Sequence, residues 1–331
     1  PLGGRLLFEA AGSAQLPTTI RGEKNAATRP MITFSSNPGT ACLYLNQARQ
    51  VVKDFDVEYT GPLQTADFLI YMPVDSCHAI GMKVNCNDNL RFGIYANNEG
   101  CVVRGCEVYN AEEDGIYAAA KHGQLIEENV CHDNAEDGIG GSLTAADHLN
   151  KIIRANICYD NGSNGITVPV GNSDGRRPIV ESNVCYNNTG DGIRITAANR
   201  LNNIIVRRNI CASNGGYGIN VPDETAQYVS RLGELECFIY DNNTYNNTSG
   251  HANPSDAADA GNPKVDPWSG TPGSGDFRVN TDMKEAANVT YLGLAATQVN
   301  RLDIGALQRE EPAGGGTDEG AEGVQIGGGI Q

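Results

Sequence analysis

The sequence is poor in aromatic residues, in basic residues and in long apolar segments. Phe, Trp and Tyr make up 6% of its 331 residues, and 24 Lys and Arg stand against 40 Asp and Glu, which gives a net charge of −16. A protein that binds nucleic acid or docks on an anionic membrane needs a basic face, so this charge balance argues against both partners. No apolar run approaches the roughly 18 residues that a membrane span requires.

The sequence also lacks a 3.6-residue apolar stripe long enough to form a helix. Its apolar residues alternate in short runs instead: Ile166 and Val168 are two residues apart, between Asn, Asp and Gly residues. This spacing is typical of short β-strands bounded by turns. In the less regular N-terminal part, strands are predicted near Thr18–Gly22, Met31–Phe34, Val51–Val57 and Ala79–Val84.

The short strands belong to a repeat of about 26 residues. Each repeat has an Asn, a Cys two residues later, a second Asn three residues after the Cys, and a Gly-Ile pair four residues further on. The cysteines are Cys131, Cys158, Cys185 and Cys211, and the frame continues to Val108 before them and to Tyr245, with Asn243, after them. A period of this length is typical of a solenoid. Strands that repeat without helices stack in parallel, so the predicted fold is an all-β parallel β-helix with coils of about 26 residues.

The repeated polar and sulfur residues have structural explanations in such a fold. Asn tolerates turn conformations and its amide bonds to neighbouring carbonyls, so stacked Asn residues form a ladder. Cysteines at equivalent positions of parallel strands point the same way, which favours a row of buried, free thiols over disulfides. Disulfides remain the alternative, because the chain has ten cysteines.

Charges of alternating sign give independent support for this alignment. Four residues before each Cys position stand Arg104, Glu127, Arg154, Glu181, Arg207 and Asp241. On stacked coils about 4.8 Å apart, these side chains form a column of opposite neighbours. Each exposed pair contributes roughly 0.2–1 kcal/mol.

The Asn, Cys and Gly-Ile coils resemble the right-handed parallel β-helix of the pectate-lyase-like superfamily. The early segment LPTTIRGEKNAATRPMITFSS, residues 16–36, and the DIGA motif at residues 303–306 resemble elements of that superfamily as well. Its members include lyases, glycosidases, epimerases and phage spikes, so the resemblance is specific for the fold and not for an activity.

Four parts of the chain are predicted from these patterns. Residues 1–92 form irregular N-terminal coils, and residues 93–250 form the regular β-helix, with an insertion at 222–236. Residues 251–309 form a closing coil and cap, and residues 310–331 are a Gly-rich acidic tail.

A line of carboxylates is the first candidate site. Asp114, Asp137 and Asp191 precede the Gly-Ile strands of three repeats, and Asn164 has the same position between the last two. Carboxylates are calcium ligands, and lyases of the resembling superfamily use calcium to bridge uronates, so these residues are candidates for a calcium site. The alternative is that Asp before Gly only stabilises a turn.

The strand after each Gly presents the second candidate site. Tyr117, Arg194 and Asn220 are predicted to point outward, with Lys121 shortly after Tyr117. In the resembling superfamily this face lines the glycan groove, where Tyr stacks on sugars and Arg or Lys holds an acidic group. An exposed strand face with ordinary polar residues is the alternative.

Two functions remain open. One is a non-catalytic β-helical module of a phage spike, virion appendage or cell-surface protein that contacts glycans. The other is a secreted lyase or glycoside hydrolase that acts on an acidic polysaccharide. The Asp pair with GHG of the polygalacturonases and the YG-DPH type signature of the alginate epimerases do not occur here, which favours the first.

The strands at the open N-terminal end of a β-helix carry unpaired backbone groups, so this end is expected to be covered by another chain, another domain or a symmetry mate. A trimer or larger assembly is favoured, because spikes of the resembling superfamily trimerise. The expected location is extracellular or on the virion, and no cofactor is expected beyond the calcium of the first candidate site.

Overall fold

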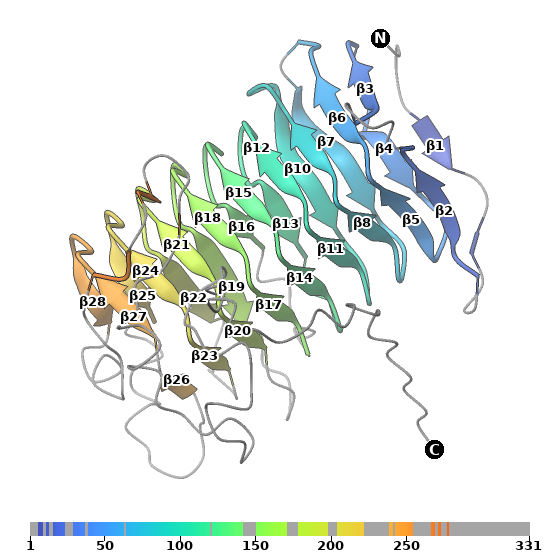
Figure 1. The fold of residues 1–331 in the computed structure, drawn as a ribbon. Helices are drawn as coiled ribbons and strands as arrows, with labels where there is room; N and C mark the ends of the chain where they lie inside the picture. The colour runs from blue at the N-terminus through green and yellow to red at the C-terminus, as the bar shows by residue number, and fades with distance from the viewer. Residues whose placement is uncertain are drawn as a thin grey trace, which may run out of the picture.

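Three parallel β-sheets run along the length of the molecule, and each turn of the chain contributes one strand to every sheet (Figure 1). The computed structural model describes residues 6–8, 11–12, 16–23, 29–36, 39–62, 64–119, 121–141, 150–170, 178–197, 204–221, 238–240, 242–253, 266–268, 271–272 and 277. Within these ranges no helix is long and apolar enough to cross a membrane. The all-β solenoid predicted from the repeat is confirmed.

The strands of the three sheets alternate along the chain. Sheet A contains β3 (Met31–Phe34), β6 (Asp56–Tyr59), β9 (Lys83–Asn85), β12 (Glu107–Tyr109), β15 (Val130–His132), β18 (Ile157–Tyr159), β21 (Val184–Tyr186), β24 (Ile210–Ala212) and β27 (Asn243–Tyr245). Sheet B contains β1 (Leu6–Phe8), β4 (Ala41–Leu45), β7 (Gln64–Met72), β10 (Leu90–Ala96), β13 (Ile116–Ala118), β16 (Ile139–Gly140), β19 (Ile166–Val170), β22 (Ile193–Ala197), β25 (Tyr217–Asn220) and β28 (Gly250–Asn253). Sheet C contains β2 (Thr18–Arg21), β5 (Gln50–Lys53), β8 (His78–Ile80), β11 (Val102–Arg104), β14 (Leu125–Glu127), β17 (Ile152–Arg154), β20 (Ile179–Glu181), β23 (Ile205–Arg207) and β26 (Phe238–Tyr240).

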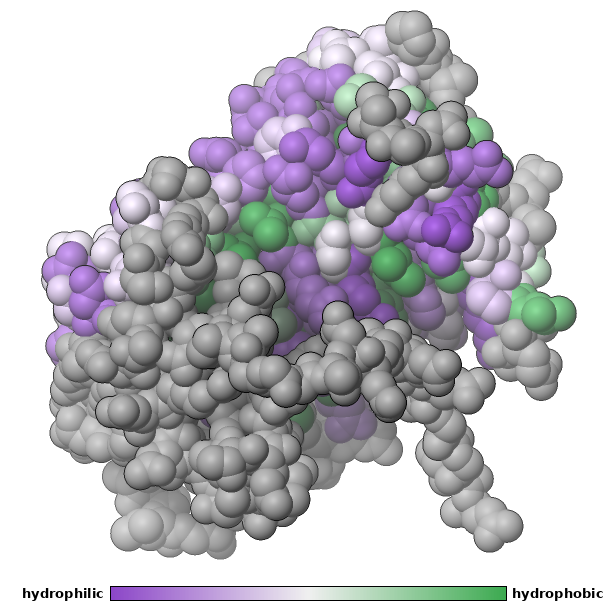
Figure 2. Space-filling model, viewed as in Figure 1, coloured by the Kyte–Doolittle hydropathy of each residue, from purple (hydrophilic) through white to green (hydrophobic). Residues whose placement is uncertain are grey.

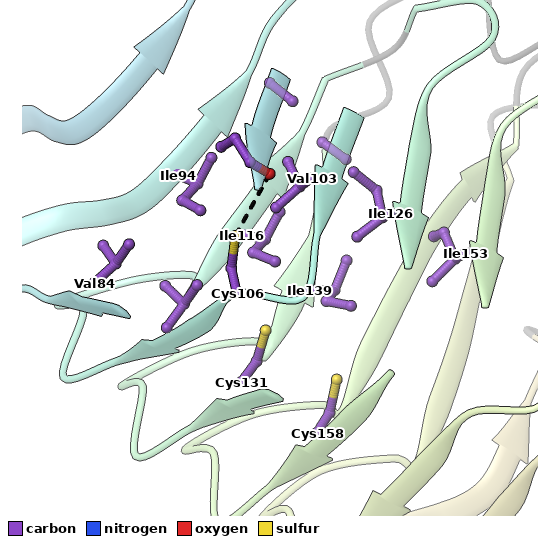
Figure 3. Close-up of a cluster of buried hydrophobic side chains, with 14 of the residues drawn as sticks. Val84, Ile94, Val103, Cys106, Ile116, Ile126, Cys131, Ile139, Ile153 and Cys158 are labelled. Atoms are coloured by element: carbon purple, nitrogen blue, oxygen red, sulfur yellow. Dashed lines mark hydrogen bonds between the residues drawn. The ribbon is translucent and has the colours of Figure 1, made fainter. Parts of the chain in front are cut away.

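The core is a set of stacked columns, one from the inner face of each sheet. Figure 3 shows Ile94, Ile116 and Ile139 of sheet B facing Val103, Ile126 and Ile153 of sheet C, with Val84, Cys131 and Cys158 from sheet A and Cys106 at the corner before β12. All of these side chains are at most 2% exposed. Full burial of one aliphatic side chain stabilises the fold by about 2 kcal/mol, so these columns hold the coils together.

The cysteine row has the predicted arrangement. Cys131 pairs in register with Cys158, Cys158 with Cys185, and Cys185 with Cys211, and all four are buried, free cysteines. Coil length is less constant than the sequence suggests. The register partners Val108 and Cys131 are 23 residues apart, whereas Cys131 and Cys158 are 27 apart.

A sharp corner joins each strand of sheet C to the next strand of sheet A. One residue at each corner has a positive φ, for example 62° at Asp54, 58° at Gly81 and 58° at Glu128. These corners divide two of the predicted strands. Val51–Val57 is split at Asp54 into β5 and β6, and Ala79–Val84 is split at Gly81 into β8 and β9.

Two ladders of asparagine amides stabilise the turns on either side of sheet A. In the first, Asn156 Nδ2 donates to Asn183 Oδ1 at 2.9 Å and to the carbonyl of Ile126 at 2.9 Å. Its Oδ1 accepts the backbone N–H and the Nδ2–H of Asn129. The second ladder repeats this pattern from Asn134 to Asn247. The predicted structural role of these asparagines is therefore confirmed.

The charge column is confirmed for five of its six predicted members. Arg104, Glu127, Arg154, Glu181 and Arg207 are successive register partners. The prediction for Asp241 is wrong by one position, because Arg207 pairs with Tyr240. For the same reason Thr244 and Asn242, rather than Tyr245 and Asn243, continue the Cys and Asn rows. The longer connection before this coil hides the one-residue shift from a fixed repeat.

The chain beyond the last regular coil returns to the side of the solenoid. Trp268 and Phe277 pack on the outer face of sheet A, where the ring of Phe277 lies 5.2 Å from that of Tyr159. The rest of the predicted closing segment 251–309 beyond Asn253, the insertion 222–236 and the tail 310–331 lie almost wholly outside the described residues. The predicted boundary between irregular and regular coils, at residue 92, lies inside β10, and coils of three strands occur on both sides of it.

The visible surface over the N-terminal coils is mostly hydrophilic, with smaller hydrophobic patches between (Figure 2). Leu16 and Met31, at 77% and 60% exposure, are the large hydrophobic side chains that the described surface leaves most open.

Candidate functional site

A column of tyrosines runs along the outer face of sheet B. Tyr44, Tyr71, Tyr95 and Tyr117 are register partners on β4, β7, β10 and β13, which lie side by side in Figure 1. They point outward because their strand neighbours, such as Ile70 and Ile94, fill the core. Successive ring centroids are 5.3, 5.3 and 4.8 Å apart.

Two phenylalanines widen this column into a surface. Phe68 and Phe92 are register partners three residues before Tyr71 and Tyr95, with ring centroids 5.6 Å apart. Phe92 also contacts the ring of Tyr117 at 4.8 Å. We call the six rings the aromatic platform: Tyr44, Phe68, Tyr71, Phe92, Tyr95 and Tyr117. All but Phe92 remain partly exposed.

The platform also has polar edges. Asn97 Nδ2 donates to the hydroxyl of Tyr71 at 3.0 Å. Burial, followed by the neighbouring Tyr117 and Tyr71 hydroxyls, raises the pKa of Tyr95 to about 12. Its hydroxyl therefore stays protonated at neutral pH and is able to donate a hydrogen bond.

The line of carboxylates predicted from the sequence continues the Phe68–Phe92 column into later coils. Each side chain accepts the backbone N–H of the next member: Asp114 from Asp137 at 3.0 Å, Asp137 from Asn164 at 2.8 Å, and Asn164 from Asp191 at 2.8 Å. Asp191 accepts the N–H of Tyr217 at 2.7 Å. These bonds support the turn interpretation of Asp before Gly. We call Asp114, Asp137, Asn164 and Asp191 the acidic ladder.

The first part of the acidic ladder is electrostatically strained. Burial raises the pKa of Asp114 well above its usual value, and the Asp137, Glu136 and Glu113 carboxylates add to this. The pKa of Glu136 is raised as well, by burial and then by Glu113 and Asp137. Arg91 offsets part of the charge through two bonds to Glu113, at 2.6 and 2.7 Å.

The structure brings together only some of the predicted glycan-binding residues. Tyr117 belongs to the aromatic platform, whereas Arg194 lies three coils further along the same column, about 14 Å away at the usual spacing of strands. Asn220 pairs with Arg194 in register and donates from Nδ2 to Asp191 at 2.7 Å. Lys121 follows the end of β13, and its backbone N–H bonds to the Ala119 carbonyl.

The calcium site remains a prediction. Asp114, Asp137 and Asp191 lie on one line, as expected, but they are spread over four coils. In the described part of the chain, no group of three or more His, Cys, Asp or Glu side chains is placed to hold a metal ion.

Two features of the structure were missed from the sequence. The platform has a signal in the repeated tripeptide Ile-Tyr-Ala at 94–96 and 116–118, which resembles Ile-Tyr-Met at 70–72. No sequence signal marks Lys151, because a lysine at the end of a turn is normally expected on the surface. It is 1% exposed and donates from Nζ to the carbonyls of Ala118 and Ala119, at 2.8 and 3.0 Å.

Residues 74–235 match the protein family described as "Right handed beta helix region". The described strands of this segment, β8 to β25, form the parallel β-helix. The comparison with curated protein sequences finds no match.

Among solved structures, the β-helix is similar to the A-module of the mannuronan C-5 epimerase AlgE6 of Azotobacter vinelandii. The TM-score is 0.47 at 16% identity, over 75% of this chain and 67% of that one. It is also similar to the periplasmic alginate epimerase AlgG, with a TM-score of 0.37 at 15% identity, over 71% of this chain and 64% of that one. The chain thus spans about two thirds of the length of these structures.

Proposed function

We propose that this chain is a rigid, non-catalytic β-helical module that binds carbohydrate on the outer face of sheet B. The observation that carries the proposal is the aromatic platform. Six rings, each in contact with at least one other, form a continuous, partly exposed surface on a protein that is otherwise poor in aromatic residues. Tyrosine combines an apolar ring with a polar hydroxyl, which suits the mixed apolar and hydroxyl surfaces of a sugar.

The scaffold under the platform supports a binding role that requires no motion. The Asn ladders, the buried columns and the parallel strand pairing fix neighbouring rings at the coil spacing, so little conformational freedom is lost when a ligand binds. Repetition of one residue type along an axis suits a polymer, because successive sugar units meet equivalent side chains.

A phage spike, a virion appendage or a cell-surface protein is the setting that we propose for such a module, outside the cell or on the virion. Assembly with further copies, with a trimer favoured, belongs to the same proposal. Leu16 and Met31, both large, apolar and exposed on the first coils, support an interface at that end.

The second candidate is an enzyme, a lyase or glycoside hydrolase, that acts on an acidic polysaccharide. The observation in its favour is the carboxyl pair Asp114 and Asp137, joined by the bond from the Asp137 N–H to Asp114 Oδ1, because burial raises the pKa of Asp114 and paired carboxyls are the usual acid and base of such enzymes. The excess of carboxylates around the pair works against an acidic substrate.

Binding of a panel of oligosaccharides tests the proposal. Tyr95→Ala removes the ring that contacts Phe68, Tyr71, Phe92 and Tyr117, and should weaken binding of the recognised oligosaccharide about tenfold. Tyr109→Ala is the matched control, since that ring stacks on His132 on the outer face of sheet A, and it should bind as the wild type does.

A panel without any ligand, or equal affinity of the Tyr95 and Tyr109 variants, would contradict carbohydrate binding at sheet B. Release of reducing ends or of unsaturated products from the same panel would identify the enzyme instead.

A further inference from the structure

Arg91 brings a positive charge to the edge of the aromatic platform. It precedes Phe92 on β10, and its guanidinium carbon lies 5.0 Å from the centre of the Phe92 ring, a cation–π contact. Burial and the Tyr117 and Tyr71 hydroxyls raise the pKa of Tyr95, and the Arg91 charge opposes them, so this charge is felt on the platform itself. An unpaired guanidinium at this place would hold the carboxylate of an acidic sugar.

Glu113 pairs with this guanidinium through two hydrogen bonds. Arg91 Nε donates to Glu113 Oε1 at 2.6 Å, and Arg91 Nη2 donates to Glu113 Oε2 at 2.7 Å. The hydrogen bond from Glu113 is the largest cause of the raised pKa of Arg91. Glu113 therefore occupies an edge of the guanidinium on which a ligand carboxylate would otherwise pair.

The edge that carries Arg91 is negative as a whole. The Glu113 N–H donates to the Arg91 carbonyl at 2.8 Å, and the Glu136 N–H donates to the Glu113 carbonyl at 3.0 Å, so the three residues stack in successive coils. After Glu113, the Glu112 and Glu136 carboxylates also raise the pKa of Arg91, against the effect of burial. Among the described residues of this edge, one cation thus faces three carboxylates. A uronate bound here would give up hydration and meet a net negative charge.

The tyrosines of the platform offer uncharged groups instead. The Tyr71 oxygen accepts from Asn97 Nδ2 at 3.0 Å, so its own O–H points away from Asn97 and is able to donate. The Tyr95 hydroxyl stays protonated at neutral pH. Hydroxyl and amide groups pair with the hydroxyls of a sugar without any charge on either side.

We infer that the platform selects uncharged glycans and that the Arg91–Glu113 pair sets this selection. The inference rests on the proposed function and adds the class of ligand: a neutral polysaccharide of hexose units, in place of the acidic polymers that the resembling superfamily suggests. Glu113 is a positioning residue. It acts through Arg91, because it cancels a charge that would attract a uronate carboxylate.

The test compares sugars of one backbone with and without a charge. Neutral hexose oligomers of the gluco, manno and galacto series are titrated by calorimetry at neutral pH, beside the uronate oligomers of the same linkage. The neutral oligomer that the protein recognises should bind about tenfold more tightly than its uronate. Methyl esterification of the uronate removes its charge and should restore most of the lost affinity.

Variants of the pair should change this ratio in opposite directions. Glu113→Gln leaves the Arg91 charge uncompensated, so the uronate should gain about tenfold relative to the neutral oligomer. Arg91→Gln leaves Glu113 uncompensated, so the uronate should lose affinity further. A purely structural role would not produce effects of opposite sign.

Glu107→Gln is the matched control for the loss of a paired carboxylate. Glu107 pairs with Lys83 at 3.0 Å, and Lys83 Nζ lies 5.1 Å from the centre of the Tyr109 ring. This second cation, carboxylate and ring lie on the outer face of sheet A. The variant should therefore keep the wild-type ratio.

The outcomes separate the inference from the proposed function. Wild-type protein that binds charged oligomers as well as or better than neutral ones, with loss of binding in Tyr95→Ala, overturns the inference and retains carbohydrate binding. A ratio that neither Glu113→Gln nor Arg91→Gln changes, or that Glu107→Gln changes equally, overturns the role of the pair. If no oligosaccharide binds at all, both the inference and the proposed function fail.

Discussion

Replacement of Asn156 by Ala probes how much the asparagine ladder contributes to stability. The side chain makes four hydrogen bonds of 2.9–3.0 Å, to the N–H and Nδ2 of Asn129, to the Ile126 carbonyl and to Asn183 Oδ1. Asn156, Asn129 and Asn183 are all 0% exposed, so water cannot replace the lost partner. At about 1 kcal/mol for each bond, the free energy of unfolding should fall by ~4 kcal/mol. That is a large part of the roughly 5–15 kcal/mol of a typical domain.

Urea unfolding followed by circular dichroism measures this loss. Thr189→Ala is the control, because Thr189 is an exposed residue of the neighbouring turn, and its replacement should change the free energy by less than ~0.5 kcal/mol. A loss below ~1 kcal/mol for Asn156→Ala would refute the reasoning. It would mean that the turn relaxes enough to provide other partners.

Three further predictions concern charge and thiols. Burial lowers the pKa of Lys151 to about 7. Between about pH 7 and 10.5 the unfolded chain therefore binds one proton more than the folded chain, and the free energy of unfolding should rise with pH across this window. Lys151→Gln copies Gln124, its neighbour one coil earlier, and melting curves at pH 7 and pH 9 should then coincide. Glu181→Arg replaces the partner of Arg207, bonded at 2.8 Å, and should lower the melting temperature at low salt but much less at high salt; equal effects would exclude a Coulombic cause. Burial raises the pKa of the Cys131 and Cys185 thiols, so the cysteine row should resist alkylation while the protein is folded. After denaturation without a reductant, mass spectrometry should find an alkyl label and no disulfide on Cys131, Cys158, Cys185 and Cys211.

The fold was predictable because every coil of a solenoid needs the same residue types at the same positions. One Asn-x-Cys unit means little, but four of them at nearly equal spacing fix which residues stack. The failure at Asp241 shows the limit of this reasoning: the connection before β26 is longer, and a fixed offset then misplaces the register by one residue.

The candidate site was predictable only in part, because it depends on neighbours from different coils. The position of Asp114 on a line with Asp137 follows from the repeat. That Phe92 packs on Tyr117 does not, because this contact joins two coils that depart from the regular repeat length. The burial of Lys151 likewise depends on how its long side chain folds back onto two carbonyls.

The direction of the ladder bonds has a consequence for the order in which the chain is made. At each step the N–H and Nδ2 of one Asn donate to the Oδ1 of the Asn one coil later, as Asn129 does to Asn156 and Asn156 to Asn183. During synthesis every new coil therefore arrives with the acceptor that the previous coil still needs. A chain shortened from its C-terminal end leaves two donors of its last ladder Asn, the N–H and one Nδ2–H, without their acceptor. One shortened from the N-terminal end leaves a single Nδ2–H donor, whose carbonyl is lost, and a spare Oδ1 acceptor, which proteins tolerate better than a spare donor. The same number of coils removed from opposite ends should not be equally harmful.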